Sequence, residues 1–319
     1  MKTSFYTRIG TAIIFLLNSY ACTKKIALKE LQFDAAVSKT TYSTNDTIAF
    51  TLTGNPDLIA FYADVPGNRF AYRNRTKADG KPILQFTSAR ANGSQANSLA
   101  LMVSSDFAGV AGTDTITSLA NITKASWTDI TSRATLSTGS AVASGSIDLS
   151  DFVAKPVYVA FKYTAVSGSI QNKWTITSLT VNNVLPDGTS YLIGNLNANN
   201  TAITNYGVST YSPGWVSYKV KNSYAWSVAA GTSLTISGAT TAATATSDAE
   251  AWVLMGPIDL KKVTPDMGVP IKAIIDNMNK FPYIYQYKTA GNYQATFIGM
   301  NQNRDNVDSV VRILPITVK

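Results

Sequence analysis

Histidine is missing from the sequence, cysteine occurs once, and glutamate occurs only at Glu30 and Glu250. Without histidine there is no Ser-His-Asp triad, no Cys-His nucleophile pair and no histidine-bearing zinc site. Aspartates are more numerous, but nothing in the sequence selects two of them as a glycosidase pair. We therefore expect a protein that is not an enzyme and that carries no cofactor.

Charge is also scarce, because charged residues make up only 14% of the chain. The lysines and arginines are scattered and the glycines form no phosphate-binding loop, so we expect no nucleic-acid binding. Apolar residues make up 45% of the 319 residues, which is enough for a sizeable core and for two domains. Beyond the first 22 residues, no apolar stretch approaches the roughly 18 residues of a membrane-spanning helix.

The first 22 residues have the layout of a bacterial lipoprotein signal. A basic start with Lys2 and Arg8 precedes a short apolar run, Ile9 to Leu17, and Ala21 directly precedes Cys22. The apolar run is too short to cross a bilayer as a helix. We predict cleavage before Cys22 and lipidation of its thiol, which anchors the chain in a membrane. The alternative is an ordinary secreted protein that has kept a stray cysteine.

The remainder of the chain has the pattern of an all-β protein. Bulky residues alternate along short segments rich in Thr, Val, Ile and Tyr, and turn residues separate these segments. We find no amphipathic helix of three turns, and residues 265–279 are expected to hold a short helix or a loop. The clearest alternating segments are Ile48 to Leu52, Leu99 to Val103, Val157 to Tyr163 and Tyr283 to Tyr287. Many short strands with Gly/Pro turns predict β-sandwiches.

The two ends of the mature chain resemble parts of one PKD or immunoglobulin-like sandwich. Near the C-terminus, Tyr293 sits where such domains keep a tyrosine-corner residue. About three strands follow residue 280, which are too few for an independent sandwich. Leu31 to Tyr62 supplies the missing strands. We predict a discontinuous domain of residues 23–75 and 280–319, with residues 76–279 inserted as a second domain.

The inserted segment resembles the choice-of-anchor and cleaved-adhesin jelly rolls, which are related to galactose-binding-like carbohydrate-binding modules. The resemblance rests on the order of its strand patterns, from Asn97 to Phe107, through Ser144 to Phe152, to Val157 to Tyr163 and Trp174 to Val181. The fold class implied for the whole chain is therefore a split PKD/immunoglobulin-like sandwich with an inserted jelly-roll sandwich.

Six stretches together resemble a lipoprotein family of the Bacteroidota known as domain of unknown function 5017. They are residues 54–62, 72–75, 250–260 and 283–293, together with Trp127 and Val157 to Tyr163. The resemblance implies glycan capture in the cell envelope beside a SusC/SusD-like complex. Surface-exported members of this group often carry acidic residues after the lipidated cysteine. Here Thr23, Lys24 and Lys25 follow, so the outer membrane is expected but the leaflet, surface or periplasmic, stays open.

Aromatic residues are the first candidates for ligand binding, because sugar rings stack on exposed aromatic faces. Tyr206, Tyr211 and Trp215 lie in the richest aromatic cluster, and a Ser-Pro-Gly turn precedes Trp215. The alternative is that these rings fill the sandwich core, as a chain with 10% aromatic residues must bury most of them. Trp127, Trp174 and Trp252 are assigned to the core.

Charged residues supply two further candidates. Arg73 and Arg75 lie in a basic, aromatic stretch where one predicted domain gives way to the other, and arginine can hold a uronate or sulfate group. The alternative is a packing or solubility role. Four aspartates at strand ends and turns are candidates for a structural calcium ion, the alternative being ordinary turn capping. They are Asp106, Asp129, Asp148 and Asp151.

Taken together, the sequence favours a lipid-anchored cell-envelope protein of a glycan-uptake system. Its expected partners are a polysaccharide or oligosaccharide, the membrane and a SusC/SusD-like complex. The expected mode of action is non-catalytic carbohydrate binding by the jelly-roll domain. The alternative is a structural or adhesion lipoprotein that makes protein contacts at the outer membrane.

Overall fold

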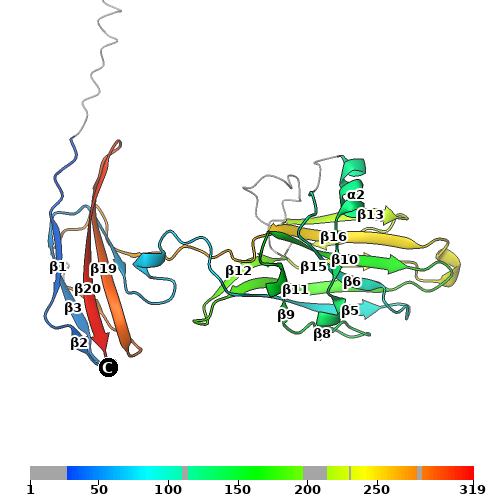
Figure 1. Cartoon of the computed structure of the whole chain (residues 1–319), viewed down its shortest axis with the longest axis horizontal. Coiled ribbons are helices and arrows are strands. Elements are labelled where there is room, and N and C mark those ends of the chain that lie inside the picture. The colour runs from blue at the N-terminus through cyan, green and yellow to red at the C-terminus, as the bar shows by residue number, and fades with distance from the viewer. Residues whose placement is uncertain (1–26, 110–113, 197–213, 230, 279–281) are drawn as a thin grey trace, which may run out of the picture. The chain divides into compact units, whose positions relative to one another are not determined.

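The computed structural model describes residues 27–109, 114–196, 214–229, 231–278 and 282–319. The chain divides into two compact units. The split unit comprises Met1–Arg73 and Asp266–Lys319, and the inserted unit comprises Asn74–Pro265. In both, most of the regular structure is β-strand, arranged as packed sheets (Figure 1). The prediction of an all-β fold made of sandwiches is confirmed.

The sequence places the second boundary between 279 and 280, whereas the structure places it between 265 and 266. The strand β17 (Val269–Lys272), assigned from the sequence to the insert, pairs with β4 (Leu58–Tyr62) of the split unit. Its four residues include a proline and carry no clear alternation, so the pattern resembles a loop. This segment belongs to the split unit because β17 pairs with β4, which is distant in sequence.

Two sheets form the split unit, one of three strands and one of five. Their strands come from both ends of the chain, because β18 pairs with β3 and β19 pairs with β4. One sheet has the order β1 (Phe33–Val37), β3 (Ile48–Gly54) and β18 (Tyr283–Tyr285). The other has the order β17, β4, β19 (Gly291–Gln302), β20 (Val307–Val318) and β2 (Thr41–Tyr42), in which β2 runs parallel to β20.

Three phenylalanines join these sheets. Phe50 lies on β3 and faces Phe61 of β4 and Phe297 of β19, and none of the three is accessible to solvent. The ring centroids of Phe297 lie 5.0 Å from Phe50 and 4.8 Å from Phe61. Such ring contacts between the two faces stabilise a sandwich by more than their buried area alone. The core of the split unit therefore needs residues from both of its chain segments.

Tyr293 forms the tyrosine corner that its position suggests. Its hydroxyl donates to the carbonyl oxygen of Thr289, four residues earlier, over 2.8 Å. The ring stacks on Tyr287 with a centroid distance of 4.0 Å. Burial of Tyr287 raises the pKa of its phenol, which stays protonated.

The inserted unit is a second sandwich with two larger sheets. The core lies between them, and residues on each strand alternate between this core and the outer faces. The first sheet has the order β13 (Gly214–Lys221), β16 (Ala249–Ile258), β10 (Val157–Ala165), β6 (Leu99–Ser104) and β7 (Thr128–Asp129). The second has the order β14 (Ser227–Ala229), β15 (Ser233–Ser237), β11 (Lys173–Val184), β5 (Lys81–Ala91) and β8 (Val142–Ala143), with β9 (Ile147–Asp148) and β12 (Ser190–Asn195) at its side.

One helix was not expected from the sequence. Helix α2 (Thr115–Lys124) begins after Asp114, whose carboxylate accepts a hydrogen bond from the N–H of Thr117 over 2.9 Å. Its residues include four threonines and serines, which have modest helix propensity, so the segment resembles a loop. Packing of Ile122, which is buried, holds the helix against the first sheet.

The division into units predicts separate responses to core truncation. Phe297→Ala removes a buried ring from the split unit and should lower its free energy of unfolding by about 3–5 kcal/mol. Phe161→Ala should do the same to the inserted unit, where Phe161 is equally buried. Tryptophan fluorescence reports the inserted unit alone, because all five tryptophans lie there, whereas far-ultraviolet circular dichroism reports both units. A shift of the fluorescence transition by Phe297→Ala, of the same size as that caused by Phe161→Ala, would contradict the division.

Candidate functional site

The central strand of the first sheet, β10, is buried on both faces. Val159, Phe161 and Tyr163 face the sandwich core, while Tyr158 and Ala160 face outward and are also buried. An outward-facing sheet surface normally meets solvent and carries polar side chains. Here it instead carries a second, smaller hydrophobic cluster.

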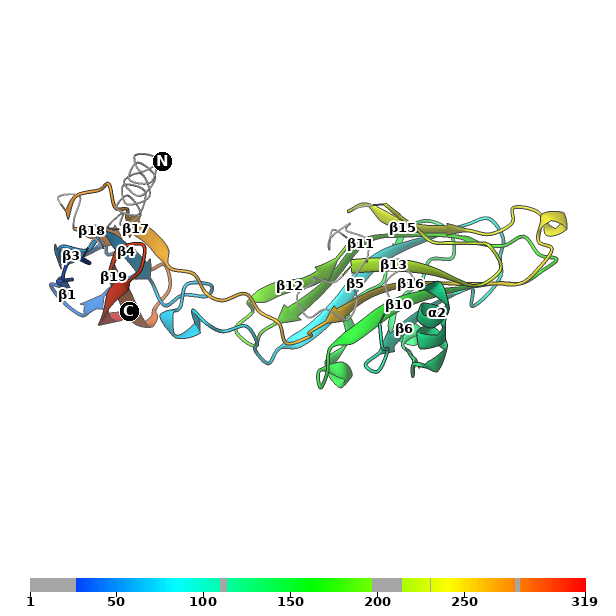
Figure 2. The ribbon, with the colours of Figure 1, turned by 90° about the horizontal axis from the view of Figure 1, so that it is seen from above.

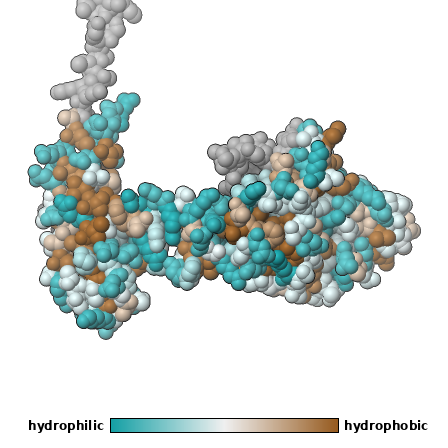
Figure 3. All heavy atoms as spheres, viewed as in Figure 1, coloured by the Kyte–Doolittle hydropathy of each residue, from teal (hydrophilic) through white to brown (hydrophobic). Residues whose placement is uncertain are grey.

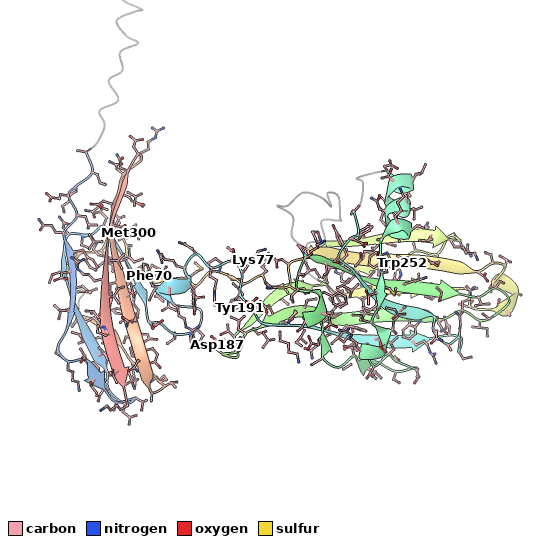
Figure 4. The ribbon with its side chains drawn as sticks, viewed as in Figure 1. Phe70, Lys77, Asp187, Tyr191, Trp252 and Met300 are labelled. Atoms are coloured by element: carbon pink, nitrogen blue, oxygen red, sulfur yellow. The ribbon has the colours of Figure 1, made fainter. Side chains whose placement is uncertain are left out.

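Aromatic rings contribute five of the residues in or packed against this second cluster. Trp252 of β16 lies 5.0 Å from Trp127, measured between ring centroids, and Phe107 lies 5.6 Å from Trp127 and 4.8 Å from Tyr158. Burial raises the pKa of the Tyr158 phenol to about 12. Tyr218 of β13 pairs in register with Trp252 and packs at the edge of the cluster. Trp252 is labelled in Figure 4.

Helix α2 covers part of this face. Figure 2 shows the helix on the side of β6 and β10 that faces away from β5, β11 and β15. Ile122 packs into the cluster, and its carbonyl oxygen accepts a hydrogen bond from Trp127 Nε1 over 2.9 Å. Trp127 and Tyr218 stay half-buried at the margin of the covered area. A set of ring surfaces is thereby held in place but kept partly open to solvent.

A charged pair lies beside these rings. Glu250 accepts a hydrogen bond from Trp252 Nε1 over 2.7 Å, and its other oxygen lies 3.4 Å from Lys162 Nζ. Lys162 Nζ also lies 5.4 Å from the centroid of the Trp252 ring. The Lys162 and Glu250 side chains are 30% and 27% exposed, so each keeps capacity for a further hydrogen bond. We call Trp127, Lys162, Tyr218, Glu250 and Trp252 the aromatic face.

The aromatic face combines flat apolar area with charged donors and acceptors. That combination suits a ligand that has apolar C–H faces and many hydroxyl groups. Among the described residues, six aspartates have pKa values below the usual range, because hydrogen bonds and nearby cations stabilise their ionised forms. These are Asp34, Asp46, Asp106, Asp114, Asp148 and Asp248.

A shallow pocket of about 390 Å³ lies at one end of the inserted unit. Its walls are the loops that follow β5 and β10, with Ser94, Gln95, Ser169 and Ile170 among the lining residues. Gln95 links the two loops, because its Nε2 donates to Thr164 O and its Oε1 accepts from Val166 N. These bonds hold the two loops together at the wall of the pocket.

The structure corrects the prediction for Trp215. This residue lies in β13, where it is 2% exposed, and its ring faces Phe161 inside the sandwich core. Its Nε1 donates to Asn195 O over 3.2 Å. The alternation along β13 directs Trp215 inward and Tyr218 outward, so Trp215 cannot offer its ring to a ligand. The core assignment of Trp174 is correct, whereas Trp252 is buried outside the sandwich core and Trp127 is only half-buried.

The structure separates the two candidate arginines. Arg73 belongs to the split unit, where its guanidinium lies 3.9 Å from the centroid of the Phe70 ring and donates to Phe70 O. Arg75 belongs to the inserted unit, and its Nη2 donates to the hydroxyl of Tyr191 over 3.2 Å. Both side chains therefore have local packing partners. The other candidates, Cys22, Tyr206 and Tyr211, lie outside the described residues.

The four candidate calcium ligands cap turns and pair with cations. Asp106 accepts hydrogen bonds from Ser104 and Ser126, and Asp129 accepts one from the N–H of Thr131. Asp148 pairs with Lys81 and Asp151 with Arg133. Within the described ranges, no three acidic, cysteine or histidine side chains come together as a metal site. Turn capping, the alternative interpretation, is what the structure shows.

Sequence patterns contained a signal for the aromatic face. Glu250 and Trp252 are two residues apart on one strand, so they share a face, and Lys162 shares the face of Tyr158 and Ala160. A lysine in an otherwise apolar strand marks the outward side. What the pattern does not reveal is that α2 covers this side and holds Trp127 against it.

Comparison with known proteins identifies a family without a function. The family model described as Domain of unknown function (DUF5017) matches residues 21–201, more than half of the chain. No curated protein and no solved structure matches the chain. In the part of the chain that the structure describes, no helix has the length and apolar character needed to cross a membrane.

Asp148 provides a test of the capping role. Hydrogen bonds from Ser150, with the nearby Lys81, lower the pKa of Asp148 to about 2, from 3.8. A depressed pKa stabilises the folded state above the unfolded-state pKa, and this stabilisation is lost as pH falls towards 2. Asp148→Asn should therefore destabilise the inserted unit most above pH 4, by about 0.5–1 kcal/mol for a solvent-screened group. Most of this destabilisation should be lost by pH 2. Equal destabilisation at pH 7 and pH 2, measured in urea, would contradict this role.

Proposed function

The chain belongs to the DUF5017 family, and we propose that this member is a lipid-anchored cell-envelope protein that binds carbohydrate without chemical conversion. The aromatic face is the observation that supports carbohydrate binding most directly. Trp127 and Tyr218 are half-buried and offer flat apolar area, while the buried Trp252 packs behind Trp127. Glu250 and Lys162 offer hydrogen-bonding charges beside these rings. The ligand class that needs both is a polysaccharide or oligosaccharide.

Rigid positioning favours such a role. Trp127 is held by its hydrogen bond to Ile122 O, and Trp252 by its bond to Glu250. A ring fixed before the ligand arrives loses little conformational entropy on binding. Glu250 and Lys162 are likewise held by each other, so the face is organised in the absence of ligand.

The membrane part of the proposal rests on Cys22 and the lipoprotein signal pattern before it. Acyl chains on Cys22 would hold the protein in the outer membrane, in the surface or the periplasmic leaflet. In this setting the protein would present glycan to a SusC/SusD-like complex of an uptake system. Both the anchor and the complex are inferred from sequence.

Carbohydrate binding is tested with the chain from Thr23 onward on glycan arrays and affinity gels. The unsubstituted chain should be retained by at least one polysaccharide. Glu250→Gln keeps the shape of the side chain but removes its charge, and should weaken binding about 10-fold or more, because a hydrogen bond to a charged group contributes about 1.5–3 kcal/mol. Trp127→Ala should weaken it at least as much through the loss of ring contact.

Two control variants lie away from the aromatic face. Asp187→Asn alters an exposed carboxylate in the turn between β11 and β12, and Tyr191→Ala removes a half-buried ring from β12. Both should bind as the unsubstituted chain does. Loss of retention in the controls but not in Glu250→Gln and Trp127→Ala would place the ligand elsewhere, and no retention on any glycan would refute carbohydrate binding.

The anchor is tested by expressing the full chain, with its first 22 residues, in a bacterium that has an outer membrane. The N-terminal peptide should begin at Cys22 and carry the mass of attached acyl chains. Cys22→Ser should abolish both cleavage at this position and membrane association. A soluble product with an unmodified cysteine would show that the protein is secreted instead.

A structural or adhesion role is the second candidate, and the split unit supports it. The outer side of β20 exposes Val311 and Ile313, which are 37% and 52% accessible, and Ile298 and Met300 of β19 lie next to them. Figure 3 shows this apolar surface as a brown band. Isolation of an outer-membrane protein on the unsubstituted chain but not on Ile313→Lys, together with no glycan binding, would favour this role.

A further inference from the structure

One end of the split unit gathers four segments that are distant in sequence. Asn55, in the turn after β3, donates to Glu30 O and accepts from the N–H of Gln32. Asn301, near the end of β19, donates to Lys29 O over 3.2 Å. The chain therefore enters the split unit beside the β3–β4 turn and beside the hairpin that joins β19 to β20. Figure 1 shows the first described residues and this hairpin at the same end.

The loop that follows β17 lies at this same end. Lys272 is 94% buried, and its Nζ donates to Asp57 O over 3.0 Å and to Ala273 O over 3.3 Å. The N–H of Ala273 in turn donates to the carboxylate of Asp276 over 2.9 Å. These bonds fix the loop against the turn that contacts the start of the chain. We call this end, with residues 28–30, 54–57, 273–277 and 302–307, the proximal pole.

Apolar side chains protrude from the proximal pole. Ile274 is 62% exposed, Ile275 is 92% exposed, and Val307 is 66% exposed. Adjacent isoleucines at a loop tip contribute nothing to the core, and water-exposed apolar area is unfavourable. The loop itself is held by polar bonds, so these side chains are displayed rather than packed.

We propose that the proximal pole docks on a lipid bilayer, with Ile274 and Ile275 inserted among the headgroups. The segment that leads from Cys22 reaches the split unit at this pole, which favours a bilayer over a protein partner. Cys22 precedes Lys29 by seven residues, so its thiol lies within about 25 Å of the pole even when the backbone is fully extended. This inference rests on the lipid anchor of the proposed function, which places a bilayer at that position.

The chemistry of the pole fits an interfacial contact. Isoleucine side chains gain free energy on transfer into the boundary between headgroups and acyl chains. Lys29 and Arg304 are exposed at the pole, but Glu30 and Asp305 are exposed there too, so the apolar side chains and not the net charge carry the contact. The insertion needs no change in the fold, because the exposed side chains already point away from the core.

The test uses the chain from Cys22 onward, coupled through its thiol to maleimide-bearing lipid in vesicles of phosphatidylethanolamine and phosphatidylglycerol. Ile275→Trp places a fluorophore at the loop tip, and brominated acyl chains quench tryptophan only at short range. The emission that Ile275→Trp adds to that of the unsubstituted chain should be lost in brominated vesicles and kept in vesicles without bromine. Because the tether is chemical, the result is independent of whether a cell lipidates Cys22.

Ala290→Trp is the matched control. Ala290 is exposed in the turn before β19, and Gln302 lies at the other end of that strand, roughly 35 Å away. Its added emission should be kept in both kinds of vesicle. Unquenched emission from Ile275→Trp, or equal quenching at both positions, would overturn the proposal while leaving the anchor and the carbohydrate site to their own tests.

Discussion

Burial of β10 on both of its faces is the constraint on which the inserted unit depends. The opposite sheet of the sandwich covers one face. The other face is apolar as well, so it needs a cover from outside the two sheets. Helix α2 and the rings of Trp127 and Trp252 provide that cover. The cover extends over only part of the sheet, which leaves half-buried rings and the Glu250–Lys162 pair at its margin.

This arrangement gives the aromatic face a rigid scaffold. Strand pairing fixes Trp252, Lys162 and Tyr218 in one row across three strands, because their positions follow from the register. Hydrogen bonds to Ile122 O and Glu250 then fix the indole groups. Sites held by strands and by a second layer of hydrogen bonds keep their geometry better than sites on loops.

Patterns of alternation predict much of the fold, including the strands around Ile48–Leu52 and Val157–Tyr163, and the resemblance to PKD and immunoglobulin-like domains predicts the tyrosine corner at Tyr293. Three features depend on tertiary contacts and do not show in local sequence. Strand β17 is defined by its pairing with β4, α2 by its packing against β10, and the inward direction of Trp215 by the register of β13. Alternation along β10 and β16 predicts that Lys162 and Glu250 lie on the outward side of the sheet. It does not predict that α2 covers part of this side, because the residues of α2 have weak helix propensity.

The central claim is that the ligand meets the aromatic face. Hydrogen–deuterium exchange of the chain from Thr23 onward, with and without an oligosaccharide retained in the affinity assay, measures this most directly. The account predicts slower exchange in the peptides that contain Trp127 and Ala249 to Leu254. Slower exchange confined to the loops of the shallow pocket, around Gln95 and Ser169, with none at Trp127, would contradict it.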